Sequence, residues 1–249
     1  MNKAILQIEN LYKNFGAIQA TKDVSFSVEQ GDVHALIGPN GAGKTTLVNQ
    51  LSGDIFPDHG TILFKDTDIT RFKAHRRAQL GIARSFQITH IFEHLTVSEN
   101  MALAIHSKNG HNFHFWKRAL GSRQIKEDIA VAIDRVDLSS RSGQPASFLS
   151  HGEKRQLEVG MAMVGNPEFL IMDEPMAGMG AGGTRELSQL INELRGKVTI
   201  LLVEHDMDVV FSLADKVTVL VYGEHVATGT PDEIRADKLV RSAYLGEEG

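Results

Sequence analysis

The chain has 249 residues, of which 42% are hydrophobic, so it is long enough to bury a sizeable core in one or two domains. Its 26 Lys and Arg are outnumbered by 31 Asp and Glu, and the net charge of −5 argues against a nucleic-acid-binding protein. The absence of cysteine excludes disulfides and zinc–thiolate sites. No segment approaches the roughly 18 consecutive apolar residues that span a bilayer, and residues 1–9 lack the apolar core of a signal peptide.

Two strands are predicted near the N-terminus, at residues 4–9 and 24–28, where apolar side chains recur in a strand pattern. Phe15 and Gly16 lie between them. An aromatic residue followed by glycine, just upstream of a phosphate loop, could stack on a purine base. It could equally be a core aromatic at a strand end, and the residues alone leave both interpretations open.

The phosphate loop itself is predicted at residues 38–45, which match the pattern G-x-x-x-x-G-K-[ST]. An apolar stretch before the loop predicts a buried strand, and a helix is predicted to open at Lys44. Backbone N–H groups of such a loop and the helix N-terminus suit phosphate oxygens. A glycine-rich turn without a ligand is disfavoured by this strand-and-helix context. The residues expected to contact a nucleoside triphosphate are Gly38, Pro39, Asn40, Gly41, Ala42, Gly43, Lys44, Thr45 and Thr46.

The side chains in this loop have distinct expected roles. Lys44 is expected to reach the β- and γ-phosphates, and Thr45 to place its hydroxyl on Mg²⁺.

The middle of the chain changes composition and predicts helices. Thr96 and Glu99 form a capping box, so a helix should begin there and run to about residue 105. Apolar residues at helical spacing predict another helix between 125 and 136. Residues 88–165 are therefore predicted to form a mostly helical insert in an α/β domain.

Three histidines, His106, His111 and His114, lie between these two helices in residues 106–122. A metal site is disfavoured because no carboxylate or thiol accompanies them, and a surface loop or partner contact is the favoured interpretation.

The rest of the chain alternates strands and helices, which is typical of an α/β fold. Continuous apolar runs predict strands buried on both faces at 169–172 and 198–203. Further strands are predicted at 61–64, 82–86, 217–221 and 225–227, and further helices at 72–80, 154–164, 184–194, 207–213 and from Thr230 onward.

Two adjacent carboxylates, Asp173 and Glu174, directly follow the strand at 169–172. A carboxylate at a strand end beside a phosphate loop can hold Mg²⁺ through its water shell, so Asp173 is a metal-ligand candidate. Glu174 points elsewhere and could polarise a water for attack on the γ-phosphate. The alternative is a solvated acidic strand end.

A second anion-binding position is predicted at residues 149–153. Ser150 and Glu153 form another capping box, so Ser150 should begin a helix. Gly152 leaves the backbone of the first turn exposed, and a helix N-terminus attracts anions.

Taken together, these motifs resemble the nucleotide-binding subunit of ATP-binding-cassette (ABC) transporters, and the resemblance spans nearly the whole chain. The family's motifs occur in its order: a Walker A loop, a Q-loop glutamine at Gln87, a signature sequence at 149–153, a Walker B strand ending in Asp173 and Glu174, and a switch histidine at His205. Phe15 falls where the family has its adenine-stacking residue.

The resemblance implies a fold and a mechanism. The expected fold is a P-loop NTPase with a RecA-like core and an antiparallel β subdomain, formed by residues 1–87 and 166–249, plus a helical subdomain at 88–165. ATP is expected to lie between one Walker A loop and the signature of a second cassette arranged head to tail. The implied roles are a catalytic base for Glu174, γ-phosphate contacts for Lys44, His205, Ser150 and Gly152, nucleotide contact for Glu153, and Mg²⁺ or water contact for Gln87.

The chain departs from the family pattern in two places. The signature has His151 and Glu153 where Gly and Gln are usual. The segment 176–183 lacks the usual Asp or Asn of the cross-dimer loop, and its four glycines predict flexibility.

Residues 84–100, 203–207 and 243–246 resemble importers of branched-chain (hydrophobic) amino acids. Importers of urea and short amides look very similar, and an ABC ATPase without a transport role is an alternative of another class. The expected setting is the cytoplasmic face of the cell membrane, bound peripherally. Expected partners are permease subunits, which dock near Gln87 and the helical insert, a second cassette and, indirectly, a solute-binding protein. No nucleic acid is expected.

Overall fold

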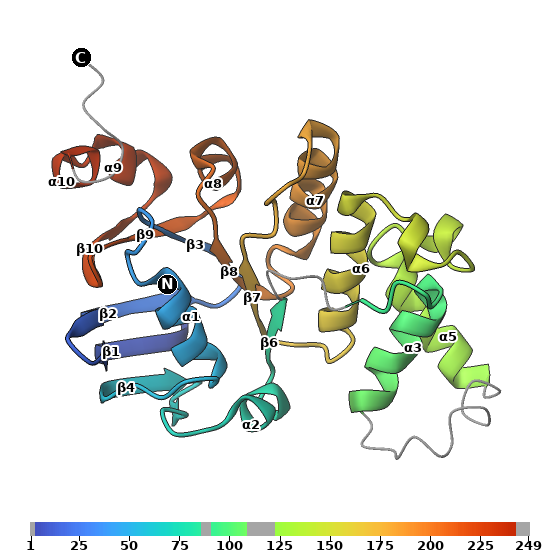
Figure 1. Cartoon of the computed structure of the whole chain (residues 1–249), viewed down its shortest axis with the longest axis horizontal. Coiled ribbons are helices and arrows are strands. Elements are labelled where there is room, and N and C mark those ends of the chain that lie inside the picture. The colour runs from blue at the N-terminus through green and yellow to red at the C-terminus, as the bar shows by residue number, and fades with distance from the viewer. Residues whose placement is uncertain (1–2, 86–90, 109–122, 243–249) are drawn as a thin grey trace. The chain divides into compact units, whose positions relative to one another are not determined.

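The computed structural model of the chain describes residues 3–85, 91–108 and 123–242. Contacts divide the chain into two compact units (Figure 1). The first unit comprises Met1–Arg84, Glu168–Glu174 and Leu194–Gly249, and the second comprises Ser85–Pro167 and Pro175–Glu193. Gln87, His111 and His114, which the sequence marks as candidates, lie outside the described residues.

A mixed sheet of ten strands, counted over the described residues, has the order β5-β4-β1-β2-β10-β9-β3-β8-β7-β6. β1, β2, β4 and β5 are antiparallel, whereas β3 pairs in parallel with β8 and β9, and β7 with β8. The predicted α/β class is therefore confirmed. The strands are β1 (Ala4–Phe15), β2 (Ile18–Glu29), β3 (Val33–Ile37), β4 (His59–Phe64), β5 (Thr67–Asp68), β6 (Ile82–Ser85), β7 (Phe169–Asp173), β8 (Thr199–Val203), β9 (Lys216–Val221) and β10 (Glu224–Gly229).

The first two strands are twelve residues each, much longer than the predicted 4–9 and 24–28. Their pairing contains several register shifts, and Asn10 and Asp23 take positive φ angles of 46° and 52°. Such irregularities interrupt the period-two alternation on which the prediction depends. Phe15 ends β1, and its side chain is 49% exposed, so the interpretation as a core aromatic is wrong.

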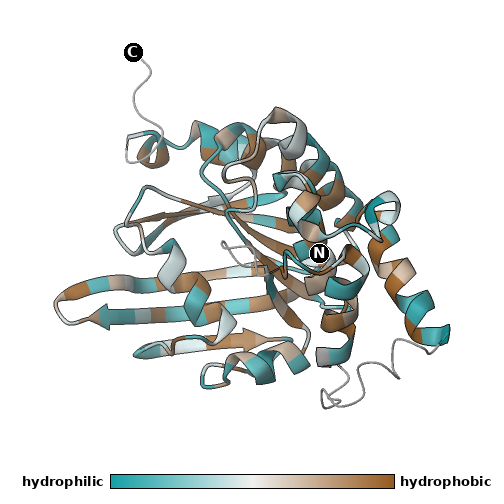
Figure 2. Cartoon of the chain, turned by 45° about the vertical axis from the view of Figure 1, so that its right-hand side comes forward, coloured by the Kyte–Doolittle hydropathy of each residue, from teal (hydrophilic) through white to brown (hydrophobic). Residues whose placement is uncertain are grey.

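Apolar residues pack on both faces of the sheet. Leu36 of β3 packs with the buried face of α1 (Lys44–Ser52), whereas Ala35 and Ile37 pack with Val210 and Ile234. The latter two belong to α8 (Met207–Leu213) and α9 (Pro231–Ala236), which is followed by α10 (Lys238–Val240). Figure 2 shows the alternation of hydrophobic and hydrophilic residues along the long antiparallel strands.

Helix α2 (Ala74–Gln79) is shorter than the predicted 72–80 and contains a buried arginine. The Arg77 guanidinium donates to the carbonyls of Gln50 and Leu51 at 2.7 and 2.8 Å, and to those of Phe72 and Thr70. Burial lowers the pKa of Arg77 to about 10, so the group stays charged at neutral pH. It therefore satisfies the carbonyls at the C-terminal end of α1.

The second unit contains α3 (Val97–Lys108), α5 (Arg123–Asp134), α6 (His151–Met163) and most of α7 (Ala181–Leu194). The Thr96–Glu99 capping box is confirmed, with the Glu99 amide donating to Thr96 Oγ1 at 3.1 Å and the Thr96 amide to Glu99 Oε2 at 2.8 Å. Helix α3 extends three residues beyond the predicted end, so His106 is helical rather than in a loop.

Helix α7 begins at Ala181, three residues before the predicted start. Gly182 and Gly183 are thus helical, and the segment 176–183 is not irregular throughout. A Cβ built on Gly152 of α6 would lie 3.2 Å from the Gly183 Cα, so the two backbones pack closely because both residues are glycine. This packing places Pro175–Glu193 with the helical unit, whereas the sequence boundaries assign it to the α/β core.

Over the residues that the structure describes, none of the helices is both long enough and apolar enough to cross a bilayer.

A chain of polar side chains crosses β3, β9 and β10, from His34 and Thr218, which are buried, to Thr228, which is exposed. His34 Nε2 lies 2.8 Å from Thr218 Oγ1, which lies 2.7 Å from Thr228 Oγ1, and that hydroxyl lies 2.8 Å from His225 Nε2. Phe26 stacks on the His34 ring, with 5.6 Å between centroids. Burial lowers the pKa of His34 to about 4, with further lowering from Lys216 and His225, so His34 is neutral at pH 7.

We expect acid to destabilise the fold through His34. Its pKa is about 4 when folded and 6.5 ordinarily, so between these values only the unfolded chain binds the proton. The free energy of unfolding should fall by about 2 kcal/mol between pH 7 and pH 5 on account of this group. Urea unfolding at pH 7 and pH 5 measures the loss of stability in both proteins. In His34→Gln the loss should be smaller than in the unsubstituted chain by about 2 kcal/mol. Equal losses in both proteins would contradict the assignment.

Candidate nucleotide-binding site

The phosphate loop connects β3 to α1 in the first unit, as the sequence predicts. All five residues of β3 are buried, and the chain enters α1 through Gly43, the N-cap, with φ 94°. The Thr45 side chain lies in the first turn of α1 and is exposed, and Thr46 is partly exposed.

Two glycines of the loop lie against neighbouring backbone. A Cβ on Gly38 would lie 2.1 Å from the Leu220 carbonyl oxygen, and a Cβ on Gly43 would lie 2.1 Å from that of Ala20. The Gly223 amide also donates to the Ala42 carbonyl at 3.0 Å. The loop is therefore held by β2, β9 and the turn after β9. The packing of the protein itself requires these two glycines, whether or not a ligand is bound.

The Lys44 side chain folds back onto its own loop. Nζ donates to the Gly38 carbonyl at 2.6 Å and to the Pro39 carbonyl at 3.0 Å, and the residue is 9% exposed. Burial lowers the pKa of Lys44, an effect opposed by the nearby carboxylates of Glu174 and Asp173. The ammonium is thus fixed at the loop, on the same side as these two carboxylates.

Asp173 and Glu174 lie where β7 ends. β7 pairs with β8 through Asp173 and Val203, and β8 pairs in parallel with β3, so these strands end at one edge of the sheet. Asp173 is 4% exposed and pairs with Arg84. Glu174 takes a left-handed φ of 47°, and its amide donates to the Val203 carbonyl at 2.9 Å.

His205 follows β8 at the same edge, and its side chain is 61% exposed. Its amide donates to Glu204 Oε2 at 3.2 Å, and Glu204 is almost completely buried. Glu204 is not among the residues predicted from the sequence to belong to the site. Its position directly after the continuous apolar run at 198–203, like that of Asp173 after its own run, is a signal that could have identified it. The ends of β7 and β8, together with the start of α1 after β3, thus bring Lys44, Asp173, Glu174 and His205 to one edge of the first unit.

Phe15 lies at the end of the β1–β2 hairpin in the same unit. Lys13 Nζ lies 5.6 Å from the centroid of this ring, which is a cation–π contact. Lys13 is itself paired with Asp58 at 2.8 Å. An exposed, flanked aromatic ring of this kind can stack on a base, and the contact with adenine stays a prediction.

The signature sequence begins α6 in the second unit, and its capping box is confirmed. The Glu153 amide donates to Ser150 Oγ at 3.2 Å, and the Ser150 amide donates to Glu153 Oε2 at 2.8 Å. Ser150 is the N-cap, as predicted, and the helix begins directly after it at His151, so the predicted range 154–164 starts three residues too late. The structure thus has the predicted helix start at Ser150, and anion binding by its N-terminus and the Gly152 backbone stays a prediction.

Glu153 carries a negative charge into this position, and the structure neutralises it locally. Arg141 Nε donates to Glu153 Oε1 at 2.7 Å. Burial raises the pKa of Glu153, but the bonds from Ser150 and Arg141 outweigh it and leave the pKa below its ordinary value. The side chain is thus engaged within its own unit, and its predicted nucleotide contact stays a prediction.

Comparison with known proteins decides the family. A model of the ABC transporter family matches residues 21–177, and a model of the branched-chain amino acid ATP-binding cassette transporter matches residues 224–249. The chain belongs to the ABC transporter family. It is an ATP-binding cassette that hydrolyses ATP.

Curated relatives match over their full length. LivG of Salmonella typhimurium, a high-affinity branched-chain amino acid transport ATP-binding protein, is 38% identical over 99% of this chain and all of its own. BraF of Pseudomonas aeruginosa, which carries the same description, is 37% identical with the same coverage. LptB of Haemophilus influenzae, the ATP-binding protein of a lipopolysaccharide export system, is 31% identical over 98% of both chains.

Solved structures of similar chains support the same family assignment. A nucleotide-free ATP-binding cassette superposes with a TM-score of 0.83 at 32% identity, covering 98% of this chain and all of that one. The ADP conformation of an ABC transporter cassette gives a TM-score of 0.84 at 31% identity, with coverage of 99% and 100%.

The residues present fit a magnesium ion that is held mainly by nucleotide. Mg²⁺ typically takes one or two protein oxygens together with phosphates and water. Thr45 offers an exposed hydroxyl, and Asp173 offers a carboxylate at the same edge of the sheet. No group of three or more His, Cys, Asp or Glu residues that could hold a metal occurs in the described ranges, so a dedicated all-protein metal cage is absent from them.

We expect Gly43→Ala to destabilise the chain more than Gly41→Ala. Both residues have positive φ, 94° and 79°, so alanine costs about 1–2 kcal/mol of backbone strain at either. At Gly43 the new Cβ also meets the Ala20 carbonyl oxygen, whereas Gly41 faces open space. Overpacking should add about 1–3 kcal/mol at Gly43 alone. Urea midpoints of the nucleotide-free variants measure the difference, and equal midpoints would contradict the packing argument.

Proposed function

We propose that this chain is the ATP-hydrolysing subunit of an importer for branched-chain or other hydrophobic amino acids. The observation that carries the proposal is the grouping of Lys44, Glu174 and His205 at one edge of the sheet. The descriptions of LivG and BraF and the match of residues 224–249 support the solute class.

Hydrolysis in this arrangement depends on position and charge. Lys44 exchanges its bonds to the loop carbonyls for β- and γ-phosphate oxygens, and the N-terminal amides of α1 bind the remaining charge. Glu174 orients and deprotonates the attacking water, and His205, exposed beside it, holds the γ-phosphate. When bound, Mg²⁺ neutralises phosphate charge, and Thr45, Asp173 and Gln87 are the residues proposed to hold it.

The second unit supplies the other half of the site in our proposal, but from a partner cassette. Ser150 and Gly152 expose a helix N-terminus with charge-neutralised Glu153 behind it, a suitable position for a γ-phosphate. Two cassettes, identical or different, therefore dimerise head to tail around two nucleotides. ATP-driven closure and reopening after hydrolysis transmit work to permease subunits on the cytoplasmic face of the membrane, where a solute-binding protein delivers solute from the other side.

A urea or short-amide importer remains the alternative within the family. The 31% identity to LptB shows that chains of this kind are also similar to a cassette of an export system. The amino-acid proposal is favoured because the full-length identity to LivG is higher, and because the C-terminal residues match the model specific to branched-chain transporters.

We expect two substitutions to separate binding from hydrolysis. Lys44→Ala removes the ammonium and should weaken ATP binding about tenfold or more, because a charge-assisted contact contributes roughly 1.5–3 kcal/mol. Glu174→Gln should retain ATP affinity but lose at least about 100-fold in turnover, as expected for a general base. Fluorescent-nucleotide titration and phosphate release measure both. Near-normal turnover in Glu174→Gln would remove it from its role, and unchanged affinity in Lys44→Ala would refute the loop assignment.

The solute is tested on the assembled transporter. The chain should be purified through an affinity tag from detergent-solubilised membranes together with its permease subunits and reconstituted in vesicles with the cognate binding protein. Leucine, isoleucine and valine are expected to stimulate ATPase activity and uptake severalfold, while urea and acetamide do not. Stimulation by urea alone would instead establish the short-amide importer.

A further inference from the structure

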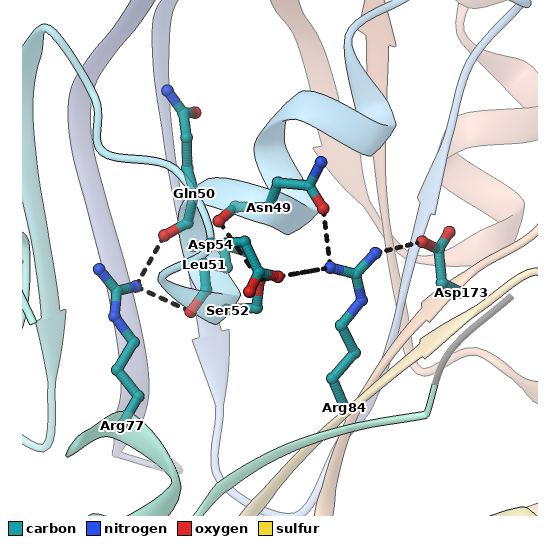
Figure 3. Close-up of polar contacts among 8 residues, drawn as sticks. All are labelled: Asn49, Gln50, Leu51, Ser52, Asp54, Arg77, Arg84 and Asp173. Atoms are coloured by element: carbon teal, nitrogen blue, oxygen red, sulfur yellow. Dashed lines mark hydrogen bonds and ion pairs between the residues drawn. The ribbon is translucent and has the colours of Figure 1, made fainter. Parts of the chain in front are cut away.

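An arginine at the end of the first unit's edge strand connects two parts of the nucleotide site. Arg84, in β6, donates from Nη2 to Asp173 Oδ2 at 2.9 Å (Figure 3). Its Nη1 donates to Asn49 Oδ1 at 2.7 Å, to Asp54 Oδ2 at 3.0 Å and to Ser52 Oγ at 3.3 Å. Its side chain is only 12% exposed.

These four partners of Arg84 come from two places in the fold. Asn49 and Ser52 belong to the last turn of α1, the helix that begins at the phosphate loop, and Asp54 follows it. Asp173 is the last residue of β7. One planar guanidinium therefore joins the far end of the loop helix to the carboxylate proposed to face Mg²⁺. A planar fork presents N–H groups on two separate nitrogens and can therefore span partners on opposite sides, whereas an ammonium presents all its N–H groups from a single nitrogen.

The contact also determines which oxygen of Asp173 is available. Oδ2 accepts from Arg84, and within the described part of the chain no hydrogen bond is made to Oδ1. The carboxylate is almost completely buried, so water does little to hold its orientation. Arg84 thus fixes the rotation of the carboxylate and directs one oxygen away from itself.

Resting on the proposed function, we propose that Arg84 is a positioning residue for the metal of the MgATP complex. It orients Asp173 so that Oδ1 meets the hydration shell of Mg²⁺, and it keeps this carboxylate in register with α1. Outer partners that orient a metal-facing group typically change metal affinity by about 10–100-fold when removed.

Electrostatics alone predict the opposite effect. A cation beside a metal site repels Mg²⁺, so loss of Arg84 would strengthen metal binding if charge dominated. In this structure the guanidinium is shared between two carboxylates, Asp173 and Asp54, which offset its field. We therefore expect the orientation of Asp173 to affect metal binding more than the charge of Arg84 does. A substitution that keeps the positive charge but removes the planar fork distinguishes these two effects.

The test compares Arg84→Lys and Arg84→Gln with the unsubstituted chain. Mn²⁺ replaces Mg²⁺ as the probe, and electron paramagnetic resonance measures its affinity for the protein–ADP complex, so no turnover is needed. ADP affinity is measured separately in EDTA. We expect Mn²⁺ binding to weaken about tenfold in Arg84→Gln and at least about threefold in Arg84→Lys, with ADP affinity in EDTA changed less than twofold.

Asp54→Asn is the matched control, since it removes one partner of Arg84 on the α1 side and leaves the contact with Asp173. It should change Mn²⁺ affinity less than either Arg84 variant. Thermal unfolding of all variants separates loss of stability from loss of metal affinity. If Arg84→Gln is insoluble, Arg84→Lys alone decides the question.

Unchanged or tighter Mn²⁺ binding in Arg84→Lys would overturn the inference, as would an equal loss of ADP affinity in EDTA, which indicates a general structural role. Failure of the proposed function gives a different result: a wrong assignment of the nucleotide site would leave the unsubstituted chain itself unable to bind Mn²⁺ in an ADP complex, and a different transported solute would leave all these affinities unchanged.

Discussion

Close contact between the phosphate loop and its neighbouring backbone is the constraint on which the first unit depends. At Gly38 and Gly43 the carbonyls of β9 and β2 occupy the space where a side chain would begin. The distance between the loop and each of these two strands is therefore fixed, and β2 and β9 have to lie at that distance on their own sides of the loop. The pairing of β2 with β10, although it involves a single register pair, lies at this junction. The loop conformation is thus a property of the whole sheet, and not of eight residues.

The loop helix is fixed at both ends by different means. Its N-terminus is held through glycine packing, and its C-terminal carbonyls are satisfied by the buried guanidinium of Arg77. A second arginine, Arg84, joins the same helix end to β7. Both arginines come from one short stretch of chain, so this stretch organises the site without containing any residue proposed to touch the nucleotide. Replacing either by a shorter cation would leave several buried acceptors without donors.

Much of the fold and of the candidate site could be predicted from sequence, because short motifs such as the loop and the capping boxes depend on local geometry. The parallel strands were recognisable since burial on both faces requires continuous apolar runs. The lengths of β1 and β2 could not be predicted, because register shifts between these strands interrupt the alternation of apolar and polar residues. The inward-facing Arg77 and the start of α7 depend on tertiary contacts, which a basic helix and a glycine-rich segment do not reveal. No residue of the candidate nucleotide site indicates a solute, so the solute class is inferred from the relatives and from the match of residues 224–249.

The bonds of Lys44 to its own loop have a consequence for the rate of the cycle. A lysine side chain loses about 1.5–2 kcal/mol of rotamer freedom when it is immobilised, and here that loss occurs on folding rather than on nucleotide binding. In the proposed mechanism, entry of ATP replaces the loop carbonyls by phosphate oxygens as partners of Lys44, and departure of ADP returns the ammonium to carbonyls already in place. The Lys44 ammonium of the empty state is therefore hydrogen-bonded, so in this mechanism loss of ADP does not carry the cost of leaving that buried charge unsatisfied.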